Sequence, residues 1–325
     1  MKRALVTGVS GQDGYYLTRL LLGEGYVVHG TVRTGAADRP VPAADLAAER
    51  PEWHGRVTLH PLELSDAAGT AEVLRRSEPD EVYHLAGQTQ VGRSVEEPVY
   101  TAEVTAMATL RLLEEIRRSG RPIRFFHAGS SEMFGEVDAS PQDERTPMRP
   151  ANPYAVSKLF GHGMVHTYRK QHGLFACSGI LYNHESPLRG TGFVTRQLAQ
   201  AAAAARAGAR APVSLRSLDA RRDWGFAGDY VEGFHRMLQA DAPADFVLAT
   251  GRTHSVREFA ERAFARVGLD YREFVVGREP VSPGPELCGR ATRAAERLGW
   301  RPRVAFDELV DMMVDAECRR LDALA

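Results

Sequence analysis

The chain has 325 residues, of which 43% are hydrophobic and 26% are charged, and its formal net charge is −1. This balance is ordinary for a globular protein and provides no global charge for binding nucleic acid or an anionic membrane surface. No apolar stretch reaches 18 residues, and the apolar run near the N-terminus is too short for a signal peptide. Three widely spaced cysteines show no metal-ligand spacing: Cys177, Cys288 and Cys318. We therefore expect a cytoplasmic protein that binds no nucleic acid, no membrane and no metal.

The first 180 residues alternate between strand-like and helix-like patterns. Short apolar runs predict strands at 4–6, 26–32, 57–62, 82–85, 125–128 and 174–181. Helical patterns lie between them, near 17–22, 66–77, 98–118 and 153–172. The alternation predicts an α/β fold, a Rossmann-type doubly wound parallel sheet with helices on both faces. The segment 34–55 is rich in Ala and Pro without a clear period, so we expect a loop with one helical turn.

After about residue 183 the pattern loosens. Helices are predicted near 192–207, 228–239, 255–267 and 305–319, and short strands near 213–216, 246–249 and 273–276. We predict a dinucleotide-binding Rossmann domain over 1–182 and a smaller C-terminal α/β substrate lobe over 183–325. The two are expected to be interleaved, with the lobe closing a cleft over the carboxyl edge of the sheet.

Three glycines, Gly8, Gly11 and Gly14, fall between the first predicted strand and the helix that follows it. Glycines here allow a tight turn and let the backbone approach a pyrophosphate at the helix N-terminus. This position makes the pattern a much stronger sign of dinucleotide binding than a glycine triplet alone. The spacing GxxGxxG resembles that of the short-chain dehydrogenase/reductase superfamily. That resemblance implies further cofactor contacts from Gln12 and Asp13, inside the turn.

The end of the second strand distinguishes NAD from NADP. An acidic residue there binds the ribose 2′-hydroxyl, whereas an arginine suits a 2′-phosphate. Arg33 lies there, 19 residues after Gly14, with no acid nearby, so we predict NADP. Asp66, after the third strand, is expected beside the adenine. Leu85 and Ala86, after the fourth strand, are expected along the middle of the cofactor.

Two clusters are predicted to carry the chemistry. Tyr154 and Lys158 lie four residues apart and share one face of the predicted 153–172 helix. The ammonium group is expected to lower the pKa of the phenol, so that Tyr154 exchanges protons with a sugar hydroxyl near neutral pH. Ser130 and Glu132 follow the fifth strand, at the edge where open α/β sheets bind ligands. They add a hydrogen-bonding hydroxyl and a second acid/base, which distinguishes a dehydratase from a plain dehydrogenase.

Within that superfamily the chain resembles the GDP-mannose 4,6-dehydratases. The matching stretches are TGVSGQDG (7–14), SSEMFG (130–135), NPYAVSK (152–158), NHESP (183–187), FVTR (193–196) and RDWG (222–225). The similarity runs from residue 1 to about 270 and resumes at 293–302, and NHESP and RDWG are distinctive. The resemblance implies a lyase that converts GDP-mannose to GDP-4-keto-6-deoxymannose and water, with NADP recycled in each cycle. It implies catalytic roles for Ser130, Glu132, Tyr154 and Lys158.

The resemblance also implies substrate contacts from Asn183, Arg189, Val194 and Arg222. A guanidinium fork matches phosphate oxygens, which suits Arg222 to a diphosphate. The alternative is an internal ion pair between Arg222 and Asp223. In resembling enzymes the helices near 98–118 and 153–172 pair between subunits, so we expect a homodimer, with a tetramer as the alternative. His162 and His166 are then expected on a packing or dimer surface.

The chain departs from the family pattern in three places. Thr34 replaces a second basic residue after Arg33, and Leu188 stands where the family often has an arginine. The segment 281–290, VSPGPELCGR, is shortened where resembling enzymes bind the nucleotide through Arg-Pro-x-Glu. The candidates to replace that motif are Glu286, Arg278 and Arg290.

Three other functions stay open from the sequence. One is another nucleotide-sugar 4,6-dehydratase, because the altered 281–290 segment leaves base and sugar less certain than the reaction. Another is a sugar-nucleotide epimerase or 4-ketoreductase, although those reactions need no carboxylate at Glu132. The third is an NADP-binding protein without turnover, against which the complete set of catalytic residues argues.

Overall fold

The computed structural model describes residues 1–33, 46, 50–279 and 286–324. Most of the loop expected at 34–55 lies outside the described residues, and its last part holds a short 3-10 turn, η1 (Pro51–Trp53). Of the shortened segment 281–290, the structure describes 286–290.

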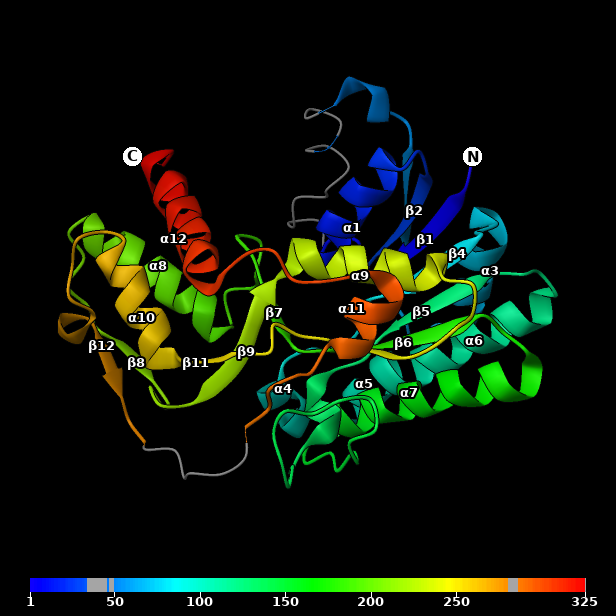
Figure 1. Cartoon of the computed structure of the whole chain (residues 1–325). Helices are drawn as coiled ribbons and strands as arrows, with labels where there is room; N and C mark the ends of the chain where they lie inside the picture. The colour runs from blue at the N-terminus through cyan, green and yellow to red at the C-terminus, as the bar shows by residue number, and fades with distance from the viewer. Residues whose placement is uncertain (34–45, 47–49, 280–285, 325) are drawn as a thin grey trace.

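Seven parallel strands form the main sheet, in the order β10-β6-β5-β4-β1-β2-β3 (Figure 1). They are β1 (Arg3–Thr7), β2 (Val27–Val32), β3 (Val57–Pro61), β4 (Glu81–His84), β5 (Arg124–Ala128), β6 (Ala176–Leu181) and β10 (Phe246–Leu248). The chain winds outward from β1 to β3 and then crosses to β4 on the other side. The strand order therefore reverses between β1 and β4, which is where doubly wound sheets bind ligands. The predicted fold class is confirmed.

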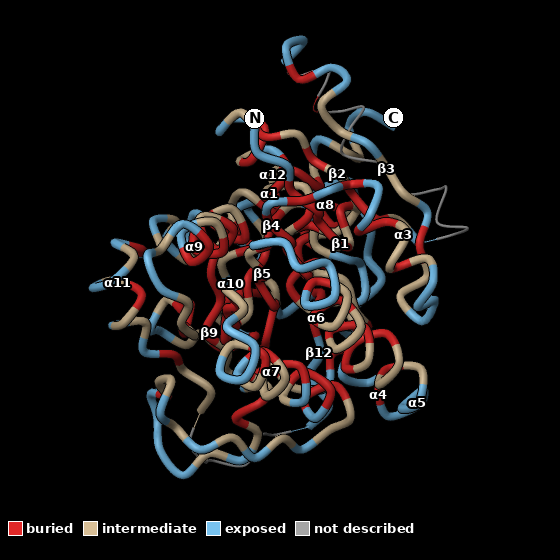
Figure 2. Tube along the Cα trace, turned by 90° about the vertical axis from the view of Figure 1, so that its right-hand side faces the viewer, coloured by how far each residue is buried: buried red, intermediate tan, exposed pale blue. Residues whose placement is uncertain are grey.

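Helices cover both faces of this sheet. α1 (Gln12–Gly23) and α9 (Ala227–Gln239) pack on one face, where Leu17, Leu21 and Phe234 share a core with strand residues. α3 (Ala67–Ser77), α6 (Ala108–Ser119) and α7 (Pro153–His172) are on the other, around a second core that contains Leu113 and Phe125. Buried residues follow the strands and the inward helix faces (Figure 2). Apolar residues recurring at helical spacing explain why these helices lie against the sheet.

The helix predicted over 98–118 is divided into three pieces. α5 (Pro98–Thr101) leads into a π-helical turn, η2 (Ala102–Met107), and then into α6. A further short helix, α4 (Val91–Glu96), precedes them. The π turn widens the hydrogen-bonding ladder by one residue, a local change that hydrophobic periodicity does not reveal.

A second lobe has its own core and two small sheets. Its strands are β7 (Asn183–Glu185), β8 (Val213–Leu215), β9 (Arg221–Phe226), β11 (Thr253–Ser255) and β12 (Val275–Gly277). They form the sheets β11-β9-β7 and β12-β8. Its helical elements are α8 (Val194–Arg206), α10 (Val256–Ala265), η4 (Tyr271–Glu273) and α12 (Phe306–Asp322). The core lies between α8, α10 and α12.

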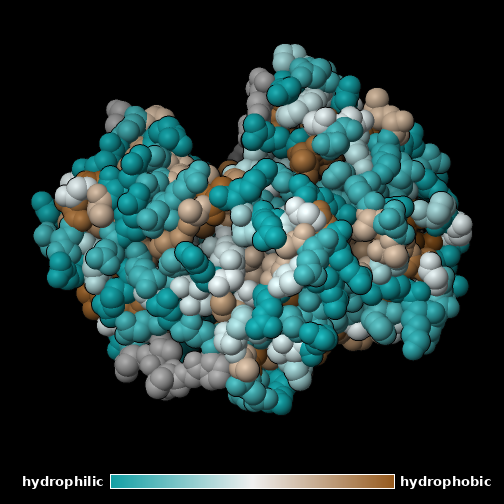
Figure 3. Space-filling view, in the orientation of Figure 1, coloured by the Kyte–Doolittle hydropathy of each residue, from teal (hydrophilic) through white to brown (hydrophobic). Residues whose placement is uncertain are grey.

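The chain returns to the first sheet after entering the second lobe. α9 and β10 belong to the main sheet and its cover, and α11 (Thr292–Leu298) packs against both. Figures 1 and 3, in one orientation, show a notch between the part that carries α12 and the part that carries α1. Within the described residues, no helix combines the length and apolarity needed to span a bilayer.

Candidate active site

The glycine turn between β1 and α1 is closely packed against its own backbone. Gly8 adopts a positive φ of 72°, and its carbonyl accepts a hydrogen bond from the Gly11 amide at 3.0 Å. A Cβ atom on Gly14 would lie 2.5 Å from the Gly8 carbonyl oxygen and 2.6 Å from Val9 Cα. The turn therefore needs glycine at these positions, and it leaves open backbone at a helix N-terminus, which fits a pyrophosphate. A turn of this kind is typical of dinucleotide-binding sheets.

The residues expected along the middle of the cofactor lie beside this turn. The Thr7 hydroxyl oxygen accepts hydrogen bonds from the amides of Leu85 and Ala86, both at 3.1 Å. A Cβ on Gly8 would lie 3.1 Å from Ala86 Cα. The ends of β1 and β4 are thus fixed together at the point where the strand order reverses.

The other two predicted cofactor residues lie at the ends of neighbouring strands. Arg33 follows β2 directly and is exposed. Asp66 is exposed at the start of α3, where its Oδ1 accepts the Gly69 amide at 2.9 Å as the helix cap. Asp66 therefore has a structural role whatever its contact with a ligand.

Ser130 and Glu132 lie just beyond the carboxyl end of β5. A 3-10 turn, η3 (Ser131–Phe134), begins there, and the Ser130 hydroxyl accepts the Glu132 amide at 3.2 Å. Ser130 is buried, whereas Glu132 is partly exposed. The turn thus holds the hydroxyl and the carboxylate two residues apart at the edge of the sheet.

A residue to which the sequence had assigned no function, Asn152, connects Glu132 to α7. Its Oδ1 accepts the Ala155 amide at 2.9 Å and so caps α7, and its Nδ2 donates to Glu132 Oε2 at 3.2 Å. An Asn before Pro153 is a sequence signal for a helix start. The contact with Glu132, which lies 20 residues earlier, leaves no such signal.

Tyr154 and Lys158 are both buried on the face of α7 that meets the sheet. Burial raises the pKa of Tyr154 to about 12, although the nearby Ser130 hydroxyl lowers it. Burial lowers the pKa of Lys158 to about 8, with the Asp13 carboxylate opposing that change. Lys158 Nζ donates to the Ala128 carbonyl at 2.7 Å and lies 5.9 Å from the centre of the Tyr154 ring.

The net lowering of the Tyr154 pKa that was expected is not found, because burial outweighs the charged groups around the phenol and the pKa is raised. The four-residue spacing does place both side chains on one helix face. The ammonium group donates to the Ala128 carbonyl at the end of β5, and none of the hydrogen bonds among the described residues joins it to the phenol. The dominant effect on Tyr154 is loss of contact with water.

Four polar side chains on adjacent strands share one register level: Thr7, His84, His127 and Ser178. His84 Nδ1 lies 2.9 Å from the Thr7 hydroxyl oxygen. Burial, together with Lys158, lowers the pKa of His84 to about 3 and lowers that of His127 as well. Both imidazoles are therefore neutral at pH 7, and Lys158 lies next to uncharged groups.

The residues inside the glycine turn reach segment 183–187, which begins with β7, through their side chains. Gln12 Nε2 donates to the His184 carbonyl at 2.7 Å, and Gln12 Oε1 accepts the Ser186 hydroxyl at 2.9 Å. Asp13 Oδ2 lies 3.0 Å from His184 Nε2, and the Tyr182 carbonyl lies 2.7 Å from Nδ1 of the same ring. Since both ring nitrogens face acceptors, both must donate, so the ring is an imidazolium ion.

The pKa values of this pair agree with that assignment. Burial opposes charge on both groups, but their mutual attraction prevails, so the pKa of His184 is raised and that of Asp13 is lowered. Gln12 and Asp13, predicted to contact cofactor, therefore use their side chains to join α1 to the second lobe. Their backbone amides remain available at the helix N-terminus.

Arg189 is held close to this group. Its Nε lies 3.0 Å from Glu185 Oε2, and its guanidinium carbon lies 3.6 Å from the centre of the Phe193 ring. Its charge is one of the influences on the pKa of Tyr154. The structure thus brings Arg189 and Asp13 into the surroundings of Tyr154.

The other predicted substrate residues lie on separate elements of the second lobe. Asn183 begins β7, and Val194 begins α8, where it packs partly against the lobe's core. Arg222 Nη1 donates to the Arg221 carbonyl at 2.7 Å. None of the hydrogen bonds or ion pairs among the described residues joins Arg222 to Ser130, Glu132 or Tyr154.

Arg222 and Asp223 do not form the internal ion pair that was the alternative for them, because neighbours on a strand point to opposite faces. The Asp223 carboxylate instead accepts the Thr250 amide and hydroxyl and the amides of Gly251 and Gly289. Asp223 therefore joins three segments of the chain.

Residues 286–290, the part of the shortened segment that the structure describes, are bound to the second lobe through Glu286. Glu286 Oε2 accepts the Thr253 hydroxyl at 2.6 Å, and Oε1 lies 3.4 Å from Arg221 Nε. Arg278 donates to the Ser214 hydroxyl at 2.7 Å, and Arg290 is exposed. Of the three candidate replacements, Glu286 thus lies next to β9, the strand that carries Arg222.

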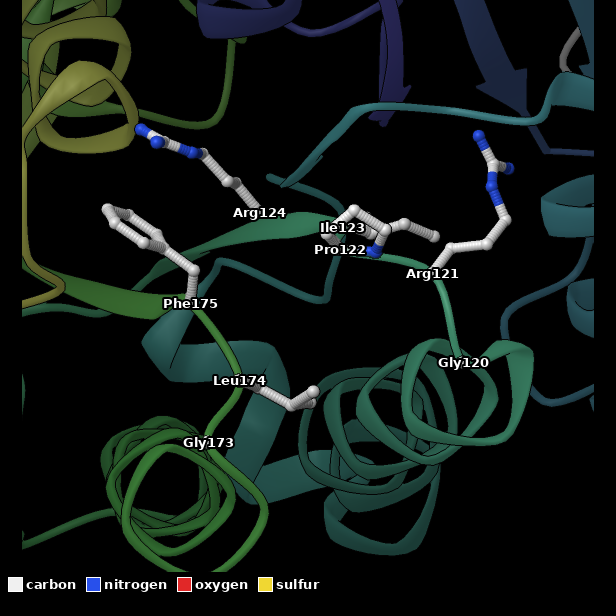
Figure 4. Close-up of a pocket in the computed structure, with 8 residues that line it drawn as sticks. All are labelled: Gly120, Arg121, Pro122, Ile123, Arg124, Gly173, Leu174 and Phe175. Carbon is white, nitrogen blue, oxygen red and sulfur yellow. The ribbon is translucent and has the colours of Figure 1, made fainter.

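A hollow lies away from this site. Its volume is about 380 Å³, and it is lined by residues 120–124 and 173–175 at the amino-terminal ends of β5 and β6 (Figure 4). Ligands of doubly wound sheets bind at the opposite, carboxyl edge. His162 Nδ1 lies 2.9 Å from the Ser178 hydroxyl, while His166 is exposed on α7.

Known proteins are similar to this chain in sequence. The profile of the GDP-mannose 4,6 dehydratase family matches residues 5–313. The chain is 44% identical over 324 residues to GDP-mannose 4,6 dehydratase 2 of Arabidopsis thaliana, covering 97% of this chain and 87% of that protein. It is 40% identical over 338 residues to GDP-mannose 4,6 dehydratase of Homo sapiens, covering 97% and 91%.

Solved structures share the fold at lower identity. RMD from Pseudomonas aeruginosa, complexed with NADPH, has a TM-score of 0.81 at 23% identity and covers 98% of this chain and 100% of its own. DesIV, a dTDP-glucose 4,6-dehydratase from Streptomyces venezuelae with NAD and TYD bound, has a TM-score of 0.84 at 22% identity and covers 99% and 98%. The full-length sequence match, together with the motifs now seen around one edge of the sheet, places the chain in the GDP-mannose 4,6-dehydratase family.

Proposed function

We propose that Ser130, Glu132, Tyr154 and Lys158 carry out the reaction of this family in the chain, the conversion of GDP-mannose to GDP-4-keto-6-deoxymannose and water. The chain is a hydro-lyase of nucleotide sugars by its family. The observation that carries the assignment of residues is the Asn152 amide, which fixes the Glu132 carboxylate to the helix that bears Tyr154. A dehydratase needs one group that takes a proton at sugar C4 and another that takes a proton at the neighbouring C5. This contact connects the two candidates, Tyr154 and Glu132.

The cofactor proposed for this site is NADP. Gly8, Gly11 and Gly14 form the cradle for its pyrophosphate, and Arg33, at the end of β2, is suited to a 2′-phosphate. Asp66, Leu85 and Ala86 are the further contacts proposed from the ends of β3 and β4. When bound, the cofactor accepts a hydride from sugar C4 and later returns it to C6.

The first step of the proposed reaction oxidises C4. Tyr154 takes the proton of the C4 hydroxyl, while the Ser130 hydroxyl donates a hydrogen bond to the same oxygen. Lys158 stays fixed by the Ala128 carbonyl and supplies a positive charge beneath the site. Since burial raises the pKa of Tyr154, its role as a base depends on positive charge close to the phenol.

The second step eliminates water. The C4 carbonyl acidifies the C5 proton, and the Glu132 carboxylate removes it. The resulting carboxylic acid gives that proton to the C6 hydroxyl, which leaves as water, so Glu132 returns to its starting form. Hydride then returns to C6, and C5 receives the proton that Tyr154 took from the C4 hydroxyl, a proton that exchanges with solvent. Tyr154 thereby returns to its starting form, and the cycle has no net change in redox state.

The substrate is proposed to lie between the two lobes. Arg189, beside Tyr154, is placed for the diphosphate, because a guanidinium group pairs well with phosphate oxygens. Asn183, Val194 and Arg222 are the further contacts proposed from β7, α8 and β9. Glu286, bound to Thr253, is the proposed replacement for the family's nucleotide-binding motif in the shortened segment.

Mass spectrometry in D₂O tests the reaction. Incubation with GDP-mannose should give a product that has lost one water and carries deuterium at C5. A product of unchanged composition apart from deuterium would indicate an epimerase, and no conversion of any nucleotide sugar despite bound NADP would indicate a protein without turnover.

Two variants test the roles of the residues. Glu132→Gln should block elimination and still allow partial cofactor reduction, visible at 340 nm, because Tyr154 remains. Tyr154→Phe should suppress both signals. Release of dehydrated product by Glu132→Gln at the parent rate would exclude the proposed role of Glu132.

We also propose that the protein is a cytoplasmic homodimer. Five large apolar side chains are exposed on α4, α5 and α7, elements that pack against one another: Val91, Val95, Val99, Val156 and Phe160. An apolar surface of this kind is typical of a subunit interface. Sedimentation should show a dimer for the parent and a monomer for Phe160→Glu. Val276→Glu, at an exposed site on β12, is the matched control, and a tetramer would appear as a larger species.

A further inference from the structure

A buried carboxylate, Glu317, lies on the last helix of the chain, outside the motifs discussed above. On α12 it follows Val310, Met313 and Val314, at the spacing that places all four on one helix face. The three apolar residues belong to the core that α12 shares with α8. Glu317, at 5% exposure, thus occupies a core-facing position, where a charge is costly unless it is paired.

Two guanidinium groups pair with Glu317. Arg196 Nε, from the buried part of α8, lies 2.6 Å from Glu317 Oε1, and Arg320 Nη1 contacts the same oxygen from the next turn of α12. Burial disfavours the charge on Arg196 and lowers its pKa, and Glu317 opposes that change. The carboxylate therefore holds two like charges next to each other that would otherwise repel.

Both arginines use their remaining donors on the loop that carries Arg189. Arg196 Nη1 donates to the carbonyls of Pro187 and Arg189, at 2.9 and 2.8 Å. Arg320 Nη2 donates to the Pro187 carbonyl at 2.7 Å. Backbone on both sides of Leu188 is thus fixed by guanidinium groups that depend on Glu317.

We infer that Glu317 is a positioning residue for substrate binding: through Arg196 and Arg320 it sets the place of the loop from which Arg189 meets the diphosphate. The inference rests on the proposed function for the role of Arg189. Glu317 touches neither substrate nor cofactor, and it acts from the opposite end of the chain to the glycine turn. Its loss lets the arginines separate, so the loop and Arg189 move while Glu132 and Tyr154 stay in place.

Glu317→Gln tests the inference, because it keeps the shape of the side chain and removes its charge. Asp311→Asn is a matched control. Asp311 is also on α12 and also pairs with two arginines, Arg262 on α10 and Arg266 directly after it, but neither reaches the loop. The measurements are KM and kcat for GDP-mannose, calorimetric titration with GDP, titration with NADP, and thermal unfolding.

We expect Glu317→Gln to raise KM for GDP-mannose and Kd for GDP about tenfold, with kcat and the Kd for NADP within about threefold of the parent. Asp311→Asn should lower the unfolding temperature and leave both ligand affinities within twofold. Glu317→Asp, which retains the charge, should restore most of the GDP affinity. Equal effects of Glu317→Gln and Asp311→Asn on GDP binding, or none of either, would overturn the inference.

A second variant keeps the test decisive if Glu317→Gln does not fold. Arg320→Met removes one loop contact at a side chain that is 39% exposed, and should raise the Kd for GDP about threefold. An unchanged Kd in this variant would also overturn the inference. Failure of the parent to convert GDP-mannose would instead refute the proposed function, whatever Glu317 does.

Discussion

Replacement of Gly14 by alanine tests the glycine turn directly. The new Cβ would lie 2.5 Å from the Gly8 carbonyl oxygen, whereas ordinary van der Waals contact begins at 3.4 Å. The turn and α1 must therefore separate by about 0.9 Å. Overpacking against backbone costs about 1–3 kcal/mol, of which the higher helix propensity of alanine returns at most about 1 kcal/mol. We expect a net loss of between about 0 and 3 kcal/mol in the free energy of unfolding.

Cofactor binding should suffer more than stability. The amides that face the pyrophosphate belong to the displaced turn, and misplacing a positioned group by about 1 Å costs up to about 100-fold. We expect the Kd for NADPH, measured by fluorescence titration, to rise about 10-fold to 100-fold. Gly23→Ala, at the other end of α1, is the control: no atom lies within 4 Å of its Cβ, so it should leave Kd unchanged and stabilise the fold slightly.

An NADPH affinity of Gly14→Ala within twofold of the parent would refute this reasoning. So would equal unfolding free energies for the two alanine variants in urea. Either result would mean that the turn tolerates a side chain, and that its glycines are not required for the approach of a ligand.

Two further predictions follow from charge and capping. Burial lowers the pKa of His84 to about 3, so between about pH 6 and pH 4.5 the unfolded chain binds a proton that the folded protein excludes. As the pH falls through this range, the free energy of unfolding measured in urea should therefore decrease by about 1.4 kcal/mol per pH unit because of this residue. His84→Asn should remove this slope. An unchanged slope in the variant would contradict the assignment. Asn152→Asp keeps the cap of α7 but places a carboxylate against Glu132, favouring its protonated form. The acid limb of the rate profile should move to higher pH with little change in stability, and an unmoved limb would argue against Glu132 as the base.

The sequence predicts most of what is local. Gly8 and Gly14 are recognisable because one turn needs them, and Tyr154 and Lys158 because a helix repeats every 3.6 residues. The second lobe was less predictable, since β7 and β11 have three residues each and show no alternation. Their pairing with β9 depends on contacts across the lobe rather than on their own composition.

The polar contacts that organise the site were not predictable for a different reason. Asp13 meets His184 and Asn152 meets Glu132 because the strand order brings distant segments to one edge, and no spacing within the chain encodes that meeting. The direction of Lys158 is a similar case. Helical periodicity gives the face on which its side chain lies, but the Ala128 carbonyl decides where the ammonium group points.

The return of the chain to its first sheet bears on how the protein is made. A ribosome that has released residues 1–182 has delivered six strands of the main sheet, but not α9, whose Phe234 stacks on Phe126 at 4.5 Å between ring centres. Nor has it delivered β10, which pairs with β6. Apolar surface on the sheet therefore stays exposed to water until residue 248 is synthesised, and a fragment ending near 182 should aggregate. The nascent chain therefore cannot complete the main sheet and its cover before several elements of the second lobe, β7, α8, β8 and β9, have been synthesised.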